Sequence, residues 1–501
     1  MEREWPMAFS KRRAALVAIA AAVFAWGPAW GQDTSLIDSV KAGDRAAALA
    51  RIKLPGAVNA READGTSALH WAVRSNDLAL AQALLRAGAD AKAANRYGVT
   101  PLSLAVINGN AAIVDALLKA GGDPAAGAGG ETILMTAARA GNPAVMRLLL
   151  ARFKADVDAR ESAYGETALM WAAAENHAEA AQLLIEHGAA INARSQLMSY
   201  PKDRFGLEGV ISVLPHGQWT PLMYAARQGS LGALRVLVKA RADLNLSDPD
   251  GTTALVFAII NSHYDAARLL VEAGANPNLA DTAGMAALYA AVDASTLGEI
   301  YGRPGKKVVN DTSAQELMNG LLAHGANANA QLRSAALYRA HTPGEPALGE
   351  GATPLMRAAK NGDVATMRLL LEHGADPSLR QKNGTTALML AAGLGRGLGV
   401  FAGDYASDAQ MLDAVRVLLA RHVDVNAVNE NGQTAVHFAA LSMDPVVRLL
   451  AENGADLSIK DKQGRTALDF AMGGGGRGRG GAAPAVRQET AALIRELLNK
   501  R

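Results

Sequence analysis

The amino-acid sequence predicts an all-α fold, a solenoid of stacked helix-turn-helix units joined by hairpin loops. Three observations support this prediction. A glycine-anchored motif recurs about every 33 residues, each unit holds two short segments with helical apolar spacing, and those segments begin and end at capping residues. A unit of this kind cannot bury its own apolar face, so its stability depends on stacking against its neighbours.

The repeat is defined by a glycine that precedes a Thr-x-Leu-like core. The glycines in this position are Gly65, Gly98, Gly130, Gly165, Gly217, Gly251, Gly284, Gly351, Gly384, Gly432 and Gly464. Seven of the ten successive gaps span 32 to 35 residues, and the other three span 52, 67 and 48. The longer gaps therefore contain a normal unit with residues inserted into it.

The unit that begins at Gly351 illustrates the expected local structure. Thr353 is placed as an N-cap and Pro354 as the first helical residue, where the missing N–H is not needed. The stretch 361–363 (Asn-Gly-Asp) ends the first helix and caps the second. Leucines 369–371 form the apolar face of that second helix, which a polar hairpin follows.

These units resemble ankyrin repeats. The Thr-Pro-Leu opening of that family is present at 100–102, 220–222 and 353–355, and its histidine is present as His70 and His437. Most other units have Thr-Ala-Leu, which keeps the cap but loses the proline. About eleven units fill residues 65–472, after an atypical N-terminal cap at 32–64. The resemblance implies a curved array whose inner helices and hairpins line a concave face, and a protein-binding scaffold without catalysis of its own.

Both ends of the chain differ from the array. Lys11, Arg12 and Arg13 precede an apolar run, and a small-x-small site ends at Gly31. This pattern predicts a bacterial-type signal peptide at 1–31, cleavage after Gly31, and export to the periplasm or outside the cell. No later segment has 18 consecutive apolar residues, so we expect no membrane span after signal removal. At the other end, 473–484 reads as a Gly-rich linker and 485–501 as a charged capping helix.

Composition and motifs argue against several other classes of protein. Lys and Arg (50) nearly balance Asp and Glu (48), which does not favour nucleic-acid binding, and there is no cysteine for a thiolate nucleophile or a Cys-ligated metal. His187, His324 and His373 occupy one repeated position before the glycine that ends a second helix, where their charge suits the helix dipole. We therefore expect no metal, no cofactor and no enzyme activity.

Aromatic side chains recur at one position of the first helices: Trp71, Trp171, Tyr224, Phe257 and Phe438. They could line a groove as interface anchors, or they could pack against the adjacent unit as core. Charged residues near the ends of the same helices, including Arg74, Glu175 and Arg227, are expected to be exposed. The predicted protein-binding residues are Trp71, Arg74, Trp171, Glu175, Arg204, Phe205, Trp219, Tyr224, Arg227 and Phe257.

Four insertions interrupt the array, at 194–215, 295–313, 331–350 and 393–408. The first, an enlarged hairpin, is too apolar for a solvated linker, and we expect 205–214 to fold back near Trp171 and Tyr224. We therefore expect it to help bind one or more partner proteins, on a chain that is a monomer. Two alternatives remain: a small-molecule binder or enzyme whose pocket is roofed around Arg204, Trp219, Tyr301 and Arg303, and a structural envelope component.

Overall fold

The computed structural model describes residues 35–125, 130–200, 215–296, 309–334, 347–395, 406–441, 443–474 and 486–500, and the backbone of 204–207 and 210–213. Contacts divide the chain into two compact units, residues 1–128 and 129–501. Each unit is described by itself below. The signal-peptide prediction, Tyr301 and Arg303, and much of the last three insertions lie outside the described residues.

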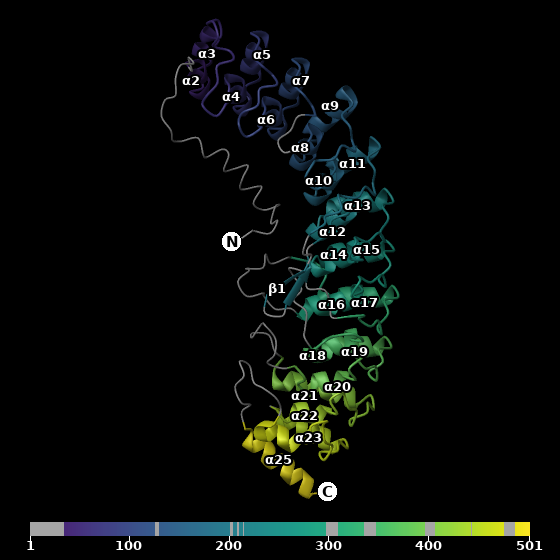
Figure 1. Ribbon diagram of the computed structural model, residues 1–501. Helices are drawn as coiled ribbons and strands as arrows, with labels where there is room; N and C mark the ends of the chain where they lie inside the picture. The colour runs from purple at the N-terminus through teal and green to yellow at the C-terminus, as the bar shows by residue number, and fades with distance from the viewer. Residues whose placement is uncertain are drawn as a thin grey trace. The chain divides into compact units, whose positions relative to one another are not determined.

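In the first unit, the described residues 35–125 form three helix pairs (Figure 1). Its inner helices pack against one another in chain order, and each outer helix packs against the inner helix before it. The pairs are α2 (Ser35–Lys41) with α3 (Arg45–Arg51), α4 (Ala68–Arg74) with α5 (Leu78–Arg86), and α6 (Pro101–Ile107) with α7 (Ala111–Lys119). The first pair lies in the predicted N-terminal cap.

The second unit repeats the same pairing, with inner and outer helices in two adjacent rows (Figure 1). The inner helices are α8 (Ile133–Ala140), α10 (Ala168–Ala174), α12 (Pro221–Gln228), α14 (Ala254–Ile260), α16 (Ala287–Thr296), α18 (Pro354–Lys360), α20 (Ala387–Ala391), α22 (Ala435–Ala439) and α24 (Ala467–Asp469), which continues as a π-helical turn, η2 (Phe470–Gly474). The outer helices are α9 (Pro143–Phe153), α11 (Ala178–Glu186), α13 (Leu231–Lys239), α15 (Tyr264–Glu272), α17 (Ala314–Ala323), α19 (Val364–Glu372), α21 (Asp408–Leu419), α23 (Asp444–Glu452) and α25 (Gln488–Asn499). The predicted helix-turn-helix solenoid is therefore confirmed.

The core lies between successive helix pairs. Small residues at the inner helices let neighbouring backbones approach closely: Ala137, Ala172, Ala225 and Ala258 are fully buried. Leucines of the outer helices, such as Leu237, are buried against them. Because every inner helix contacts the inner helix of the next pair, this core is continuous along the second unit, and burial of apolar area stabilises it.

Local caps fix the helix ends as the sequence predicts. The Thr353 side chain accepts a hydrogen bond from the backbone N–H of Met356 at 3.2 Å, and Pro354 is the first residue of α18. Asp363 caps α19 by accepting from the N–H of Thr366 at 3.1 Å. Each such cap is worth about 1 kcal/mol to the helix that it begins.

Asparagine side chains connect successive hairpins. Asn245 Oδ1 accepts from the backbone N–H of Asn276 at 2.8 Å, and Asn278 Oδ1 accepts from that of Asn327 at 2.8 Å. Asn278 Nδ2 also donates to the Gly325 carbonyl at 2.8 Å. The hairpin edge is therefore joined from one unit to the next by side chains as well as by packing.

The histidines that the repeat explains have clear roles. Nδ1 of His187, His324 and His373 lies 2.8, 2.8 and 2.9 Å from the carbonyl oxygen four residues earlier, so each ring caps the end of its outer helix. His70 and His437 connect two units instead. Nδ1 of His70 pairs with the Ser67 cap and Nε2 lies 3.1 Å from the Val99 carbonyl oxygen of the following unit.

Two local features depart from the all-helical prediction. The first insertion contains a two-stranded antiparallel sheet, β1 (Arg204–Leu207) and β2 (Val210–Val213), in which Arg204 pairs with Val213 and Leu207 with Val210. Near the C-terminus, the last inner helix is α-helical only from Ala467 to Asp469 and continues as a π-helical turn from Phe470, in which Gly473 has a non-helical φ of 92°. Within the described residues, no helix is both long and apolar enough to cross a membrane.

Candidate binding surface

The aromatic series of the inner helices divides into two groups. Trp171, Tyr224, Phe257 and Phe438 are only 3, 5, 5 and 6 % exposed, whereas Trp71 is half-buried. Trp219, which precedes α12 and is not part of this series, is also half-buried. For these four buried rings, burial favours core over groove, the two interpretations that the sequence leaves open, and a role in partner binding stays a prediction. They can support a binding surface but offer little area to a partner.

Trp219 is the centre of an aromatic cluster in the second unit. Its ring packs edge-on against Tyr224 and Phe257, with centroids 5.5 and 5.1 Å apart. The guanidinium of Arg227 lies 5.2 Å from the Trp219 ring centroid, and the indole N–H donates to Asp248 Oδ2 at 3.3 Å. These contacts fix the ring orientation while leaving part of the side chain exposed, which is the arrangement expected of an interface anchor.

A buried polar network lies beneath this cluster. The Tyr224 hydroxyl donates to Glu166 Oε1 at 2.7 Å, and Ser195 Oγ accepts from the backbone N–H of Trp219 at 2.9 Å. Burial, reinforced by the negative charge of Glu166, raises the pKa of Tyr224 well above its usual value. The phenol therefore remains a proton donor at neutral pH and holds its helix against the start of α10.

The enlarged hairpin has an ordered root. Its two arms pair as antiparallel backbone: the N–H of Ser195 donates to the Trp219 carbonyl at 3.0 Å, and the N–H of Met198 donates to the His216 carbonyl at 2.7 Å. A β-bridge joins Leu197 to Gly217 between these bonds. The described part of the insertion is therefore a β-ribbon that continues a repeat hairpin.

Both neighbouring hairpins hold this ribbon. On one side, the N–H of Gln196 donates to the Tyr164 carbonyl at 2.6 Å. On the other side, Nδ1 of His216 lies 3.2 Å from each carboxylate oxygen of Asp250, and Arg194 donates to the Ser247 carbonyl at 2.9 Å. The direction of the root is thus set by three successive hairpins.

The remaining predicted residues are placed as follows. Trp71 donates its indole N–H to Glu62 Oε2 at 2.7 Å, and the charged ends of Lys41 and Arg74 lie 4.8 and 5.0 Å from its ring centroid. Arg74 is exposed and Glu175 half-exposed. The side chains of Arg204 and Phe205 lie outside the described residues, and so does the predicted fold-back of 205–214. A binding role for all these residues stays a prediction.

The sequence analysis missed a buried ion pair at the same register. Arg357 occupies the aromatic position of α18, and its Nε donates to Asp293 of α16 at 2.5 Å. A second bond of 2.6 Å joins Arg357 to Asn361 Oδ1. The same two positions elsewhere hold Arg139 and Trp171, with the guanidinium 5.1 Å from the ring centroid. An arginine in an aromatic series was the signal that could have revealed this pair.

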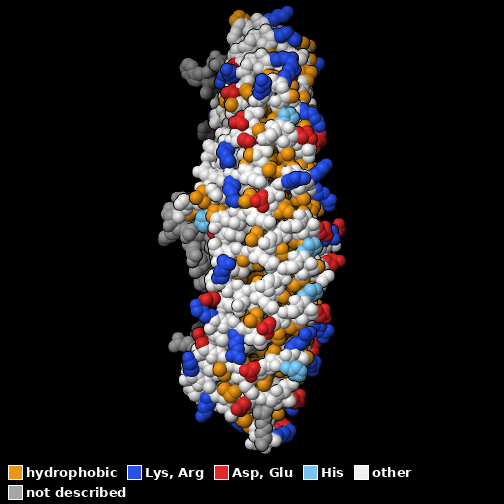
Figure 2. All heavy atoms as spheres, turned by 90° about the vertical axis from the view of Figure 1, so that its right-hand side faces the viewer, with side chains coloured by type: hydrophobic (Ala, Val, Ile, Leu, Met, Phe, Trp, Pro, Cys, Tyr) orange, Lys and Arg blue, Asp and Glu red, His pale blue; other side chains and the backbone are white. Residues whose placement is uncertain are grey.

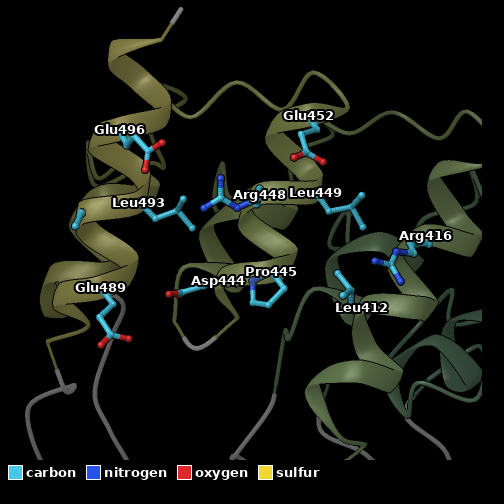
Figure 3. Close-up of a pocket in the computed structure, with 11 residues that line it drawn as sticks. Leu412, Arg416, Asp444, Pro445, Arg448, Leu449, Glu452, Glu489, Leu493 and Glu496 are labelled. Carbon is cyan, nitrogen blue, oxygen red and sulfur yellow. The ribbon is translucent and has the colours of Figure 1, made fainter.

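Among the described residues of the second unit, two hollows stand out, and neither is lined by Trp219. One of about 520 Å³ is lined by hairpin residues of three successive repeats, including Gln381, Asn383 and Asn431. A larger one of about 660 Å³ lies between outer helices α21, α23 and α25 (Figure 3). No group of acidic or histidine side chains in the described part of the chain could hold a metal ion.

The face formed by the outer helices carries charges of both signs among apolar atoms, without a region of one sign (Figure 2). Arg147, Arg235 and Arg268 are exposed at one register of α9, α13 and α15. Arg147 pairs with Glu179 and Arg268 with Glu272. Because these charges are solvated and locally balanced, they do not define an anion-binding surface.

More than half of the chain matches one protein family. Residues 36–127, 126–195, 207–294, 310–398 and 404–477 match the family described as ankyrin repeats (3 copies). The chain is 34% identical over 142 residues to the mitochondrial disaggregase of Bos taurus, covering 24% of this chain and 21% of that protein. It is 28% identical over 176 residues to the Drosophila melanogaster transient receptor potential cation channel subfamily A member 1, covering 30% and 15%.

The chain therefore spans about a fifth or less of the length of these two relatives. Among solved structures, it is similar to the human ASB11 ankyrin repeat domain, with 26% identity, a TM-score of 0.40, and coverage of 48% of this chain and 96% of that one. It is also similar to the ankyrin repeat domain of Bcl-3, with 28% identity, a TM-score of 0.36, and coverage of 45% and 93%.

Proposed function

Because the chain belongs to the ankyrin-repeat family, we propose that it is a protein-binding scaffold that presents its inner helices and enlarged hairpin to a partner protein. Ankyrin-repeat domains typically mediate protein–protein interaction and are typically not enzymes. The proposed partner site is centred on Trp219 and the root of the β-ribbon. Catalysis has no part in this proposal.

The observation that carries the proposal is the fixed position of the ribbon root. Backbone pairing between Ser195 and Trp219 and the contact between His216 and Asp250 hold it against neighbouring hairpins. Leu197, in the middle of the root, is 54 % exposed, so the ordered backbone of the root presents an apolar side chain at the surface. A preformed apolar surface lowers the ordering cost of binding, and rigid presentation is therefore the proposed mechanism.

The proposed compartment is the periplasm or the outside of a bacterial cell. The support is in the sequence: the basic residues Lys11, Arg12 and Arg13, the apolar run after them, and the small residue Gly31 at the expected cleavage site. Mass spectrometry of the protein purified from its host should find a chain that begins at Gln32. Recovery of the full-length chain from the cytoplasm would contradict export.

The binding proposal is tested by shortening the ribbon without disturbing its root. Residues 199–215 are replaced by Asn-Gly, which closes a two-residue hairpin between Met198 and His216. We expect the melting temperature to change little, because the root bonds and the Trp219 cluster remain. Partner recovery from the native host should fall strongly, since the projecting part of the surface is gone.

A photo-crosslinker places the partner on the surface directly. Benzoylphenylalanine at Leu197 should crosslink to the partner, and the same residue at Arg235, exposed on outer helix α13, should not. Undiminished recovery by the shortened chain, or crosslinking from Arg235 alone, would argue against this site.

A further inference from the structure

A groove on the outer side of the second unit is separate from the proposed partner site. It has a volume of about 660 Å³ and is bordered by α21, α23 and α25 (Figure 3). Ligand pockets in proteins commonly span about 300–1,000 Å³, so the groove has room for several side chains.

The lining of the groove is apolar at its base. Leu412 of α21, Leu449 of α23 and Leu493 of α25 each contribute one side chain, and Pro445 adds a fourth apolar surface. Leu412 and Leu449 are half-buried, and Pro445 is exposed. One leucine on each of three successive helices forms a strip that crosses the helices, which is the kind of surface that receives the side-chain ridge of another helix.

Some charged groups around the groove are already paired. Arg416 donates to Asp413 at 2.9 Å, Asp444 accepts from the Thr490 hydroxyl, and Glu496 pairs with Lys500. Because these charged groups already have hydrogen-bond or ion-pair partners within the protein, they gain little from a ligand.

Three charged side chains are different. Arg448, Glu452 and Glu489 line the groove, are exposed, and form no hydrogen bond or ion pair with the described residues, although the charge of Arg448 is one of the causes that lower the pKa of Glu496. In Figure 3 they lie in a diagonal row, with Glu489 on α25 at one end, Arg448 on α23 in the middle and Glu452 at the other end. The groove therefore offers the charge order minus, plus, minus beside an apolar strip.

We propose that this groove binds an amphipathic helix of a partner protein that carries basic, acidic and basic residues in that order beside an apolar stripe. A helix places residues three and four apart on one face, so both the charge row and the stripe fit a single helical surface. Charge order of this kind sets orientation and selects against wrong partners more than it adds affinity. The leucine strip supplies the affinity, since burying apolar area is the main favourable term.

The test uses two fluorescein-labelled synthetic helical peptides of about 14 residues, roughly four turns. One carries Lys-Glu-Lys along a leucine stripe, and the other carries Glu-Lys-Glu at the same positions. Fluorescence anisotropy with the full chain should show binding of the first peptide and at least about tenfold weaker binding of the second. The double variant Glu452→Lys/Glu489→Lys should reverse this preference.

The matched control is Glu272→Lys/Glu372→Lys, which changes the last residues of α15 and α19, the positions equivalent to Glu452 at the end of α23. This variant should keep the wild-type preference, and melting curves should show that both variants are folded. Equal binding of the two peptides, a preference that follows the control variant, or no saturable binding up to about 1 mM would overturn the proposal.

Discussion

Arg357 and Asp293 form an ion pair that is almost completely withdrawn from water, with side chains 4 and 7 % exposed and an N–O distance of 2.5 Å. They join α16 to α18 at the register where Arg139 and Trp171 join α8 to α10. One geometric position in the stack therefore accommodates either an ion pair or a cation–π pair. A buried charge without its partner is strongly unfavourable, whereas an apolar or stacked replacement of the whole pair can be tolerated.

The first prediction concerns replacement of the Arg357–Asp293 ion pair by a cation–π pair. Asp293→Ala should lower the free energy of unfolding by about 3–5 kcal/mol, because Arg357 would lose its buried carboxylate. The double variant Asp293→Arg/Arg357→Trp should lose at least about 1 kcal/mol less than the sum of its two single changes, since it rebuilds the Arg139–Trp171 contact. Urea unfolding of the four chains measures this coupling, and strict additivity would show that the positions are independent.

Inter-unit histidines give the stability a pH dependence. Burial lowers the pKa of His70, His263 and His437 below the ordinary value of 6.5. As the pH falls through 6.5, these histidines bind protons in the unfolded chain before they do so in the folded chain. Their contribution to the free energy of unfolding is therefore complete above pH 6.5. It is lost as the pH falls from 6.5 toward the lower pKa values of the folded state. The carboxylates act in a lower window: hydrogen bonds from Ser378 hold the pKa of Asp376 below 3.8, so its contribution persists until the pH falls below that value.

The second prediction follows from this loss of stability at acid pH. The double variant His70→Gln/His437→Gln should lose less stability than the wild type between pH 8 and pH 5.5, because glutamine bonds in the same places without binding a proton. Urea midpoints at the two pH values provide the comparison. An identical loss in both chains would show that these two histidines do not account for the acid sensitivity.

The sequence predicted the parts of the fold that repeat. Glycine spacing located the units, and local capping rules located the start of α18 at Thr353 and of α19 at Asp363, because both signals act within a few residues. The boundary between the two compact units at residue 128 was not predictable in this way, since the gap from Gly98 to Gly130 is a normal 32 residues.

The candidate site was less predictable, because it depends on contacts between distant residues. Periodicity placed Trp171 and Tyr224 on an inner face but could not say whether the next unit covers them. The hydrogen bond from Tyr224 to Glu166 joins residues 58 positions apart, and the ribbon root joins Ser195 to Trp219 across 24. Such pairs are set by the stacking of units and by strand register, which one sequence does not specify.

A contact between successive pairs gives the third prediction. Gly141 ends α8 in the left-handed region with a φ of 67°, and a Cβ added there would lie 2.5 Å from Nδ1 of His177 in the next unit. Gly141→Ala should therefore lose about 1–2 kcal/mol from backbone strain and a further amount from displacing the ring. Gly188→Ala is the matched control, because Gly188 has a φ of 88° and no atom within 4 Å of the added Cβ. Equal losses in urea unfolding would show that the histidine contact has no cost.

Trp219 provides the last prediction, which separates its structural role from a role in binding. Trp219→Ala should lower stability by about 2–3 kcal/mol, because a half-buried ring leaves Tyr224 and Phe257 unsupported. Trp219→Phe keeps a ring in place and loses the bond to Asp248, which still accepts from the backbone N–H of Thr252, so it should cost only about 1 kcal/mol. Partner affinity should fall several-fold even in Trp219→Phe if the exposed indole edge contacts the partner. Affinity that falls only in Trp219→Ala, in step with its melting temperature, would assign this tryptophan to the core of the ribbon root.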